Sequence, residues 1–427
     1  MTEWKEYTVQ DLIDLNMIEE PMDGNHGGIH PKTTDYVPVG VPFIMANNLV
    51  DGGVDLENCS FITEEQANSL RKGFAHPGDV LLTHKATIGR TAIVPDKYPV
   101  IILTPQVTYY RIKKDINKGY LKYYFDSPDF QNTLSSWANS GSTRAYLGIT
   151  AQHKLPVVLP SLEIQDKIAS ILSAIDDKIQ NNKQINRNLL DQANTFFQSW
   201  FVEYEPFGGS RPDDWKEGIL EDIIEFSNGY AFKSKELLNE PDSERDCYHV
   251  FKQGHINRGG GFNITGTKSW YPKDLAKNLQ KYVLQKGDVL MAMTDMKDNV
   301  AILGNTAVME IEGEYIVNQR VGLIRPTGIY GIQYPYIALL TNSYDFLKDL
   351  RSRANSGVQV NLSSNEIRNS SIYIAPESVN KEFNELVMPL FEAMIVNDIE
   401  NLRLADLRDE LLPKLISGEL DISDMDI

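Results

Sequence analysis

The chain has 427 residues, a net charge of −18 and a hydrophobic fraction of 42%, which leaves room for two or three domains with their own cores. No apolar run approaches the ~18 residues that a membrane span needs, and the N-terminus lacks the basic and apolar regions of a signal peptide. The two cysteines, Cys59 and Cys247, have no metal-ligand spacing, so we expect a cytoplasmic protein without a bound metal.

The negative charge is unevenly distributed along the chain. Residues 1–155 and 210–370 carry net charges of only −4 and −2, whereas residues 371–427 carry −9. Half of the excess therefore lies in the C-terminal segment. A nearly neutral region can still carry a basic face, so the acidity weakens a nucleic-acid-binding interpretation without excluding it.

The first part of the chain, residues 1–157, is expected to form a β-rich domain. Short β-type runs begin at Asp79, Thr91, Val100 and Val107, and Gly, Pro and Asn residues separate them. Short runs between turn residues are typical of a β-rich α/β domain.

A helical spacer is expected over residues 158–207. Apolar residues recur in steps of three and four from Leu162 to about Phe201, which predicts one long amphipathic helix. Prolines before this stretch and Pro206 after it are typical of a helix start and a helix end. About 40 residues at a rise of ~1.5 Å make a helix of roughly 60 Å.

Residues 208–374 repeat the first domain. Three short motifs of the first copy return in the same order, with offsets between 209 and 216 residues. They are Trp4-Lys-Glu at Trp215, Gly78-Asp-Val-Leu at Gly287 and Asn139-Ser-Gly at Asn355. A tandem duplication of one domain-sized unit explains this order, whereas a solenoid needs at least three shorter repeats.

The last segment, residues 375–427, repeats the helical spacer. Asn182 and Asn186 on the first apolar stripe correspond to Asn397 and Asn401 on the second. Buried asparagines in a helical seam lower stability but fix register and orientation. The alternative is that these positions are exposed where the stripe drifts around the helix.

The two spacers are expected to pack against each other as antiparallel helices, which would relate the two halves by a pseudo-two-fold axis. Pro389 is expected to interrupt and kink the second helix. The predicted fold class is therefore α/β (α+β), with two β-rich domains separated by two long antiparallel coiled-coil helices.

The sequence contains no convincing catalytic constellation. It has neither a Gly-x-x-x-x-Gly-Lys-Ser/Thr loop nor a Gly-x-Gly-x-x-Gly motif after a strand, and its seven histidines are scattered. Asp126-Ser-Pro-Asp lacks the second proline and the aromatic residue of the tetrapeptide of amino-methylating enzymes. We therefore expect no catalysis and no cofactor in this chain.

Polar and basic loop residues are better suited to contact with a nucleic acid. In the major groove Arg pairs with guanine, and Gln or Asn pairs with adenine. Each copy offers three such loops at matched positions, although each could also be an ordinary solvated or domain-closing loop. The candidates are Asn47, Asn48, His84, Lys85, Thr87, Arg90, Thr143 and Arg144 in the first copy, and Gln253, His255, Arg258, Lys297, Asn299, Gln359 and Asn361 in the second.

Five longer motifs carry a family likeness. They are Gly78-Asp-Val-Leu-Leu, Ala86-Thr-Ile-Gly-Arg, Leu159-Pro-Ser-Leu-Glu-Ile-Gln-Asp-Lys-Ile-Ala, Phe197-Gln-Ser-Trp-Phe-Val-Glu-Tyr-Glu-Pro-Phe and Leu407-Arg-Asp-Glu-Leu-Leu-Pro-Lys-Leu-Ile-Ser-Gly-Glu. In this order, over nearly the whole chain, the sequence resembles the DNA-specificity subunits of type I restriction-modification systems. The second copy departs from the pattern: it lacks the Thr-Ile-Gly motif, and Pro376-Glu-Ser-Val-Asn replaces Pro-x-Leu-Glu-x-Gln.

The resemblance implies a non-catalytic specificity subunit with two target-recognition domains, each reading one half of a bipartite site in double-stranded DNA. It also implies that the helices act as a spacer and as a docking surface for two methylation subunits. Those subunits would carry S-adenosylmethionine, and restriction (translocase) subunits would join later. The expected docking residues are Trp200, Phe201, Leu411 and Leu412.

Two other classes of protein remain open. A stand-alone modification enzyme or nuclease is disfavoured by the missing donor cradle and catalytic tetrapeptide. A DNA mimic or scaffold of a defence system is suggested by the charge of −18, but a mimic should spread its acid over the surface, and here half of it lies in one segment.

Overall fold

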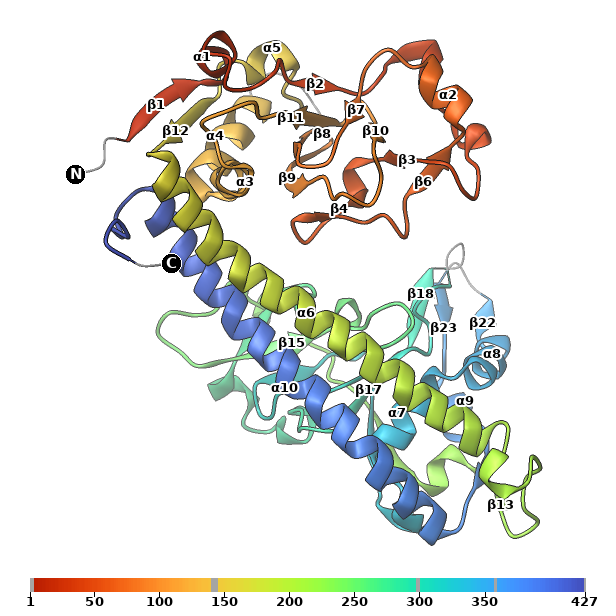
Figure 1. Cartoon of the computed structure of the whole chain (residues 1–427). Helices are drawn as coiled ribbons and strands as arrows, with labels where there is room; N and C mark the ends of the chain where they lie inside the picture. The colour runs from red at the N-terminus through yellow and green to blue at the C-terminus, as the bar shows by residue number, and fades with distance from the viewer. Residues whose placement is uncertain (1–3, 140–144, 297–299, 357–358, 426–427) are drawn as a thin grey trace. The chain divides into compact units, whose positions relative to one another are not determined.

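The computed structural model describes residues 4–139, 145–296, 300–356 and 359–425. The chain forms two compact units, unit 1 from Met1–Gln180 with Asn401–Ile427 and unit 2 from Asn181–Glu400. Each unit contains one β-rich domain and a part of each of two long helices (Figure 1). Domain 1 denotes residues 4–159 and domain 2 denotes residues 216–374.

The two long helices are α6 (Leu162–Phe201) and α10 (Glu377–Ile416), each 40 residues long. The apolar periodicity predicted the first helix correctly at both ends. The expected interruption at Pro389 is wrong, because α10 continues through this residue as one helix. A proline removes one hydrogen-bond donor, and packing of the surrounding turns compensates for that loss.

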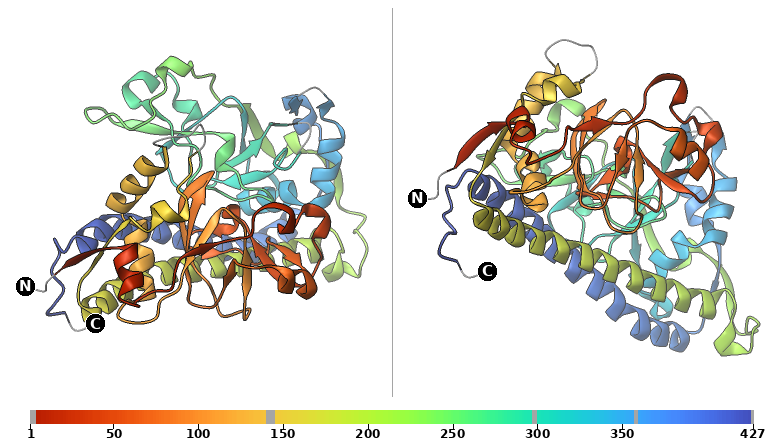
Figure 2. Two further views of the ribbon diagram at one scale, coloured as in Figure 1. Left: turned by 90° about the horizontal axis from the view of Figure 1, so that it is seen from above. Right: turned by 45° about the horizontal axis from the view of Figure 1, so that its top comes forward.

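Asparagines lie in the seam between the two helices of unit 2. Asn186 Oδ1 accepts a hydrogen bond of 2.8 Å from Asn397, and its amide donates to the Met394 carbonyl at 3.1 Å. The fully buried Asn182 donates to Glu400 at 2.7 Å. From Asn182 to Asn186 the position on α6 moves toward its C-terminus, while the partner on α10 moves back from Glu400 to Asn397, so the helices are antiparallel, as expected. They lie side by side in both views of Figure 2.

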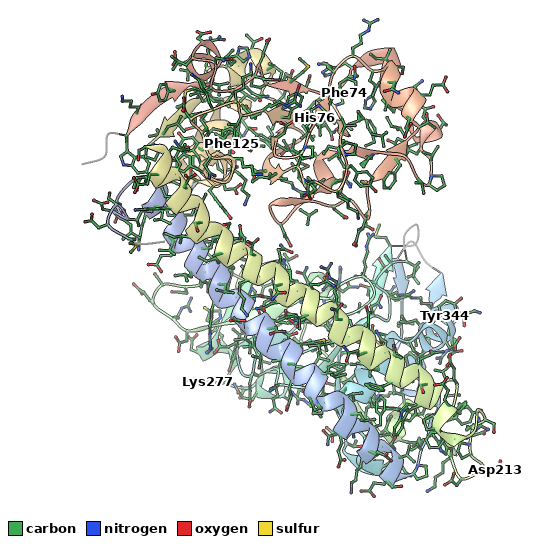
Figure 3. All side chains as sticks on the ribbon, viewed as in Figure 1. Phe74, His76, Phe125, Asp213, Lys277 and Tyr344 are labelled. Carbon is green, nitrogen blue, oxygen red and sulfur yellow. The ribbon has the colours of Figure 1, made fainter. Side chains whose placement is uncertain are left out.

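Domain 1 is built on two four-stranded sheets. Its elements α3 and α4 cover one side of the second sheet, where Phe125 of α3 is fully buried (Figure 3). The first sheet has the order β6 (Ser60–Ile62), β3 (Val41–Ile44), β10 (Ile101–Leu103) and β7 (Phe74–Ala75), and the second has the order β2 (Met22–Asp23), β11 (Val107–Tyr110), β8 (Val80–Lys85) and β9 (Thr87–Ile93). The helices are α1 (Val9–Asp14), α2 (Glu64–Ser69), α3 (Lys118–Asp126), α4 (Pro128–Asn139) and α5 (Ile149–Gln152), and β4 (Leu49–Val50) pairs with β5 (Gly53–Val54).

Domain 2 repeats this plan with one four-stranded sheet and two three-stranded sheets. Its strands occur in the order β14 (Ile224–Asn228), β21 (Val321–Pro326), β17 (Val289–Ala292) and β19 (Thr306–Val308), then β16 (Trp270–Pro272), β15 (Cys247–Phe251) and β20 (Tyr315–Val317), and finally β18 (Thr294–Met296), β23 (Gln359–Asn361) and β22 (Asn355–Ser356). Its helices are α7 (Tyr334–Asn342), α8 (Tyr344–Ser352) and α9 (Ser364–Arg368).

The first and last strands of each domain pair with each other. In domain 1, β1 (Lys5–Thr8) is antiparallel to β12 (Pro156–Leu159), and in domain 2, β13 (Lys216–Ile219) is antiparallel to β24 (Ser371–Ile374). The expected boundary at residue 157 therefore falls inside β12, because that strand completes domain 1.

The repeated Gly-Asp-Val-Leu motif has the same structural role in both domains. The carboxylate of Asp79 accepts two hydrogen bonds from Arg111, at 3.0 and 2.8 Å, and one from the backbone N–H three residues earlier. Asp288 and Arg325 repeat this arrangement at 2.8 and 2.9 Å. The motif thus maintains a bidentate ion pair at the start of β8 and of β17.

The fourth residue of each long helix ties the helix start to its domain. Gln165 accepts from the backbone N–H of Asn117 at 2.9 Å and donates to the Pro160 carbonyl at 3.0 Å. Asn380 donates to the Tyr330 carbonyl at 3.0 Å. In the second copy Asn380 thus stands in place of the glutamine of the Pro-x-Leu-Glu-x-Gln motif and still anchors the helix start to its domain, with a shorter amide side chain.

We predict that Asp79→Ala destabilises unit 1 by about 2 to 3 kcal/mol, because it leaves the half-buried Arg111 guanidinium without its carboxylate. Urea unfolding with hydrogen exchange of β8 and β11 measures the loss. Lys114→Ala is the matched control, since its ion pair with Asp115 at 3.9 Å is exposed and should contribute less than about 0.5 kcal/mol. Equal effects of the two variants would contradict the proposed role of Asp79.

Candidate nucleic-acid interface

The hairpin between β8 and β9 presents polar side chains at its tip. Lys85 pairs with Thr87 across a turn in which Ala86 adopts a left-handed conformation with φ 65°. This conformation is uncommon for a residue other than glycine and gives a tight turn. Lys85 and Thr87 are both exposed, so they are available to a partner.

Tyr146 lies beside this tip, and sequence reasoning missed it as a candidate. Its backbone forms a bridge with Lys85, and its side chain is 47% exposed. The Lys85 ammonium lies 5.9 Å from the Tyr146 ring centroid. The available signal was an aromatic residue in a loop of polar residues. The candidates expected in this loop, Thr143 and Arg144, lie outside the described residues.

His84 is buried beneath Tyr146 and is not exposed for contact, which corrects the expectation from the sequence. Its Nδ1 pairs with the Thr108 hydroxyl at 2.6 Å, and its ring packs edge-on against Tyr146 at 5.9 Å. Burial lowers the pKa of His84 to about 4, although the nearby Asp23 carboxylate acts in the opposite direction. The ring is therefore neutral at pH 7 and supports the hairpin from inside.

The turn η3 (Ala46–Asn48) lies next to the same hairpin. Arg90 is exposed, yet its guanidinium donates to the carbonyls of Leu49 at 3.2 Å and Ala46 at 3.4 Å, which links the hairpin to the turn. Asn47 is exposed. Asn48 is buried and accepts from the Met45 N–H at 2.9 Å, so, contrary to the expectation, its side chain is not available for contact.

Domain 2 has the same frame with different side chains. Thr294 of β18 pairs with Asn361 of β23, at the place where domain 1 pairs Lys85 with Tyr146. Asn361 is exposed, and Met296, at the end of β18, is 58% exposed. The structure thus brings an amide and a thioether to the surface at the place where domain 1 carries an amine and a phenol.

The remaining candidates of domain 2 differ in their accessibility. Gln253 exchanges hydrogen bonds with Thr294, receiving one of 2.7 Å from its hydroxyl, and so supports β18. Arg258 is exposed in the loop that follows. His255 is fully buried and accepts from the Lys252 N–H at 3.0 Å, so, contrary to the expectation, it is not available for contact either. Lys297, Asn299 and the side chain of Gln359 lie outside the described residues.

The four expected docking residues pack inside their own units. Trp200 and Phe201 are half-buried, with ring centroids 5.8 and 4.8 Å from that of Phe383. Leu412 is buried in the core of unit 1, and Leu411 packs against that core. Burial removes Leu412 from contact with a partner, whereas Trp200, Phe201 and Leu411 keep part of their surface exposed.

Two negative findings apply to the described ranges of the chain. No group of three His, Cys, Asp or Glu side chains is arranged to hold a metal ion there. Within the same ranges no helix is both long enough and apolar enough to cross a membrane.

We predict that unit 1 loses stability as the pH falls from 6.5 toward 4. The folded-state pKa of His84 lies below its usual value of 6.5, so the unfolded chain binds the proton more tightly and acid favours unfolding. The contribution is about 3 kcal/mol at pH 4. Urea unfolding of the wild type and of His84→Asn between pH 4 and 7 measures it.

The variant should lose overall stability but show a shallower pH dependence in this range. His255→Asn is the matched control, because burial also lowers the pKa of His255 to about 4, but in unit 2. An unchanged pH slope in unit 1 after His84→Asn would contradict the assignment.

Comparison with known proteins connects this geometry to a family. A model of the type I restriction modification DNA specificity domain matches residues 1–190 and again residues 212–401. The MjaIX type I restriction enzyme specificity subunit of Methanocaldococcus jannaschii is 28% identical over 99% of this chain and 95% of its own length. The HindI specificity subunit of Haemophilus influenzae is 25% identical over 62% of this chain and 69% of its own length.

The fold has a solved relative as well. The crystal structure of a type I restriction-modification system S subunit from M. genitalium matches with a TM-score of 0.55 and 16% identity, over 97% of this chain and 96% of that chain. This likeness concerns the fold, while the family model covers both copies of the duplicated unit. The chain belongs to the family of type I restriction-modification DNA specificity subunits.

Proposed function

We propose that each of the two domains reads one half of a bipartite site in double-stranded DNA. The observation that carries this proposal is the matched pair of strand ends, with the exposed Lys85 and Tyr146 in domain 1 and the half-buried Thr294 beside the exposed Asn361 in domain 2. A common backbone frame with different side chains suits two readers of different sequences.

The side chains fit distinct contacts in the major groove. A lysine binds guanine or a phosphate, and an asparagine forms two hydrogen bonds with adenine. The Tyr146 ring offers an apolar face to a thymine methyl group or a sugar. The interface we propose consists of Asn47, Lys85, Thr87, Arg90 and Tyr146 in domain 1, and Arg258, Thr294, Met296 and Asn361 in domain 2.

We further propose that two methylation subunits dock on the long helices and supply S-adenosylmethionine and catalysis, with restriction subunits joining them. The outward faces of the helices offer further side chains for this role beside those expected from the sequence. Ile185 and Leu190 on α6 and Leu386 and Val396 on α10 are exposed apolar side chains. Exposed apolar groups on a helix face are typical of a protein-binding surface.

We predict that Tyr146→Ala and Lys85→Ala relax one half of the methylated motif, whereas Asn361→Ala relaxes the other. Each lost base contact should cost about 1 to 3 kcal/mol of discrimination. Mapping methylated adenines in cells that carry each variant with its methylation subunits measures this.

Lys114→Ala is the control, because this exposed lysine follows β11 at the end of the sheet opposite the Lys85 tip. A motif without two parts in the wild type would refute bipartite reading itself. Duplex affinity that is insensitive to salt would favour the DNA-mimic alternative, since phosphate binding weakens as counterions compete.

We also predict that the helices set the gap between the two half-sites. Removing seven residues from α6 and the seven corresponding residues from α10 preserves the seam and shortens the pair by about 10 Å, or about three base pairs. The same methylation mapping should show a shorter gap between unchanged half-sites. A change in the recognised bases with an unchanged gap would contradict the spacer role.

A further inference from the structure

A group of charged side chains connects domain 1 to both long helices inside unit 1. Lys122 of α3 is only 7% exposed, and its Nζ lies 3.1 Å from Asp126 and 3.4 Å from Asp176 of α6. Asp176 accepts a hydrogen bond of 3.0 Å from Arg408 of α10 and one of 2.7 Å from the Tyr123 hydroxyl. We call Lys122, Asp176 and Arg408 the charged set.

Asp176 is the ionised centre of this set. Burial opposes its charge, but Lys122, Tyr123 and Arg408 outweigh burial and hold the pKa of Asp176 below its usual value. Burial raises the pKa of Asp126, even with Lys122 beside it. Lys122 thus lies between two carboxylates, of which only Asp176 belongs to the helix pair.

The corresponding positions of unit 2 are apolar. Helices α3 and α7 are both nine residues long, and α6 and α10 are both 40 residues long, so each pair aligns end to end. The charged set then corresponds, in order, to Ala338, Phe391 and Ala193, which we call the apolar set. All three are buried and belong to one hydrophobic core cluster.

A neighbouring hydrogen bond supports this alignment. Asp126, the last residue of α3, accepts from the Thr91 hydroxyl at 2.5 Å. Asn342, the last residue of α7, donates to the Thr306 hydroxyl at 2.9 Å. The two copies therefore keep a polar contact at this position and differ at the three positions of the charged set.

We propose that the charged set and the apolar set determine which helix segments each domain packs on. Domain 1 fits a helix pair that offers an aspartate and an arginine, and domain 2 fits one that offers a phenylalanine and an alanine. In an exchanged arrangement Lys122 would lose Asp176, while Asp176 and Arg408 would face Ala338. A buried charge that loses its partner is strongly unfavourable, even where the intact pair adds little stability.

The same sets favour the pairing of α6 with α10 of one chain over the pairing of two copies of the same helix from two chains. Two antiparallel copies of α6 would place Ala193, not Arg408, against Asp176. Two copies of α10 would place Arg408 against Phe391. Tandem repeats are prone to misassembly between similar units, and these mismatches disfavour it.

The test compares single substitutions with the complete exchange in the full-length chain. Lys122→Ala, Asp176→Phe and Arg408→Ala each create a mismatch, whereas the triple variant converts unit 1 to the apolar set. Hydrogen exchange of α3 should accelerate at least ~10-fold in the Asp176→Phe variant. The triple variant should exchange more slowly than this single variant. Amides of unit 2 should not change.

The proposal would be overturned if the losses of α3 protection added up, so that the triple variant was the least protected of all. It would also be overturned if the single variants exchanged as slowly as the wild type. Lys414→Ala is the control on the same helix, since Lys414 forms an exposed pair with Glu410 at 2.8 Å. It should leave the exchange of α3 unchanged.

The converse exchange tests the proposal if the unit 1 variants do not fold. Ala193→Arg places an unpaired charge in unit 2, and adding Ala338→Lys with Phe391→Asp completes a charged set there. The triple variant should recover most of the protection that the single variant loses in α7. No recovery would overturn the proposal.

A separate experiment tests whether the charged and apolar sets disfavour helix pairing between two chains. Two differently tagged full-length chains are co-expressed. The unit 1 triple variant, whose helices are alike at these positions, should co-purify with its other tagged form several-fold more than the wild type does. Equal co-purification would overturn this part of the proposal.

Discussion

The antiparallel seam between α6 and α10 is the constraint on which the rest of the structure depends. Each helix exposes one face and buries another, and the buried face contains amides that bond across the seam, such as Asn186 with Asn397. An amide buried in an apolar seam is tolerated only in the register that satisfies its hydrogen bonds. This requirement fixes which turn of one helix meets which turn of the other, and each domain is anchored to the first turn of one helix through Gln165 or Asn380.

Much of the fold could be predicted because its signals are local. The 3.6-residue periodicity gave both ends of α6, and the short apolar runs gave β8, β10 and β11. The interruption at Pro389 was wrongly expected, because packing along a long helix outweighs the loss of one backbone donor. The duplication itself is a sequence property, and the paired contacts of Asp79 and Asp288 explain why these residues recur.

The exposed hairpin that we propose as part of an interface was predictable as a region, but the exposure of its individual side chains was not. The hairpin was found because polar residues follow a strand, whereas the burial of His84, His255 and Asn48 depends on partners distant in the sequence. Polar character alone does not separate a side chain that supports a turn from one that faces solvent. Tyr146 was overlooked for the opposite reason, since an aromatic side chain is usually assigned to a core and here lies at the surface.

The pairing of β1 with β12, and of β13 with β24, has a consequence for how such a protein can evolve. Because the first and last strands of a domain are hydrogen-bonded neighbours, the chain enters and leaves the domain at adjacent points. A domain attached in this way is an insertion cassette: gene exchange can replace the segment between the two strands without altering the path of the chain outside it.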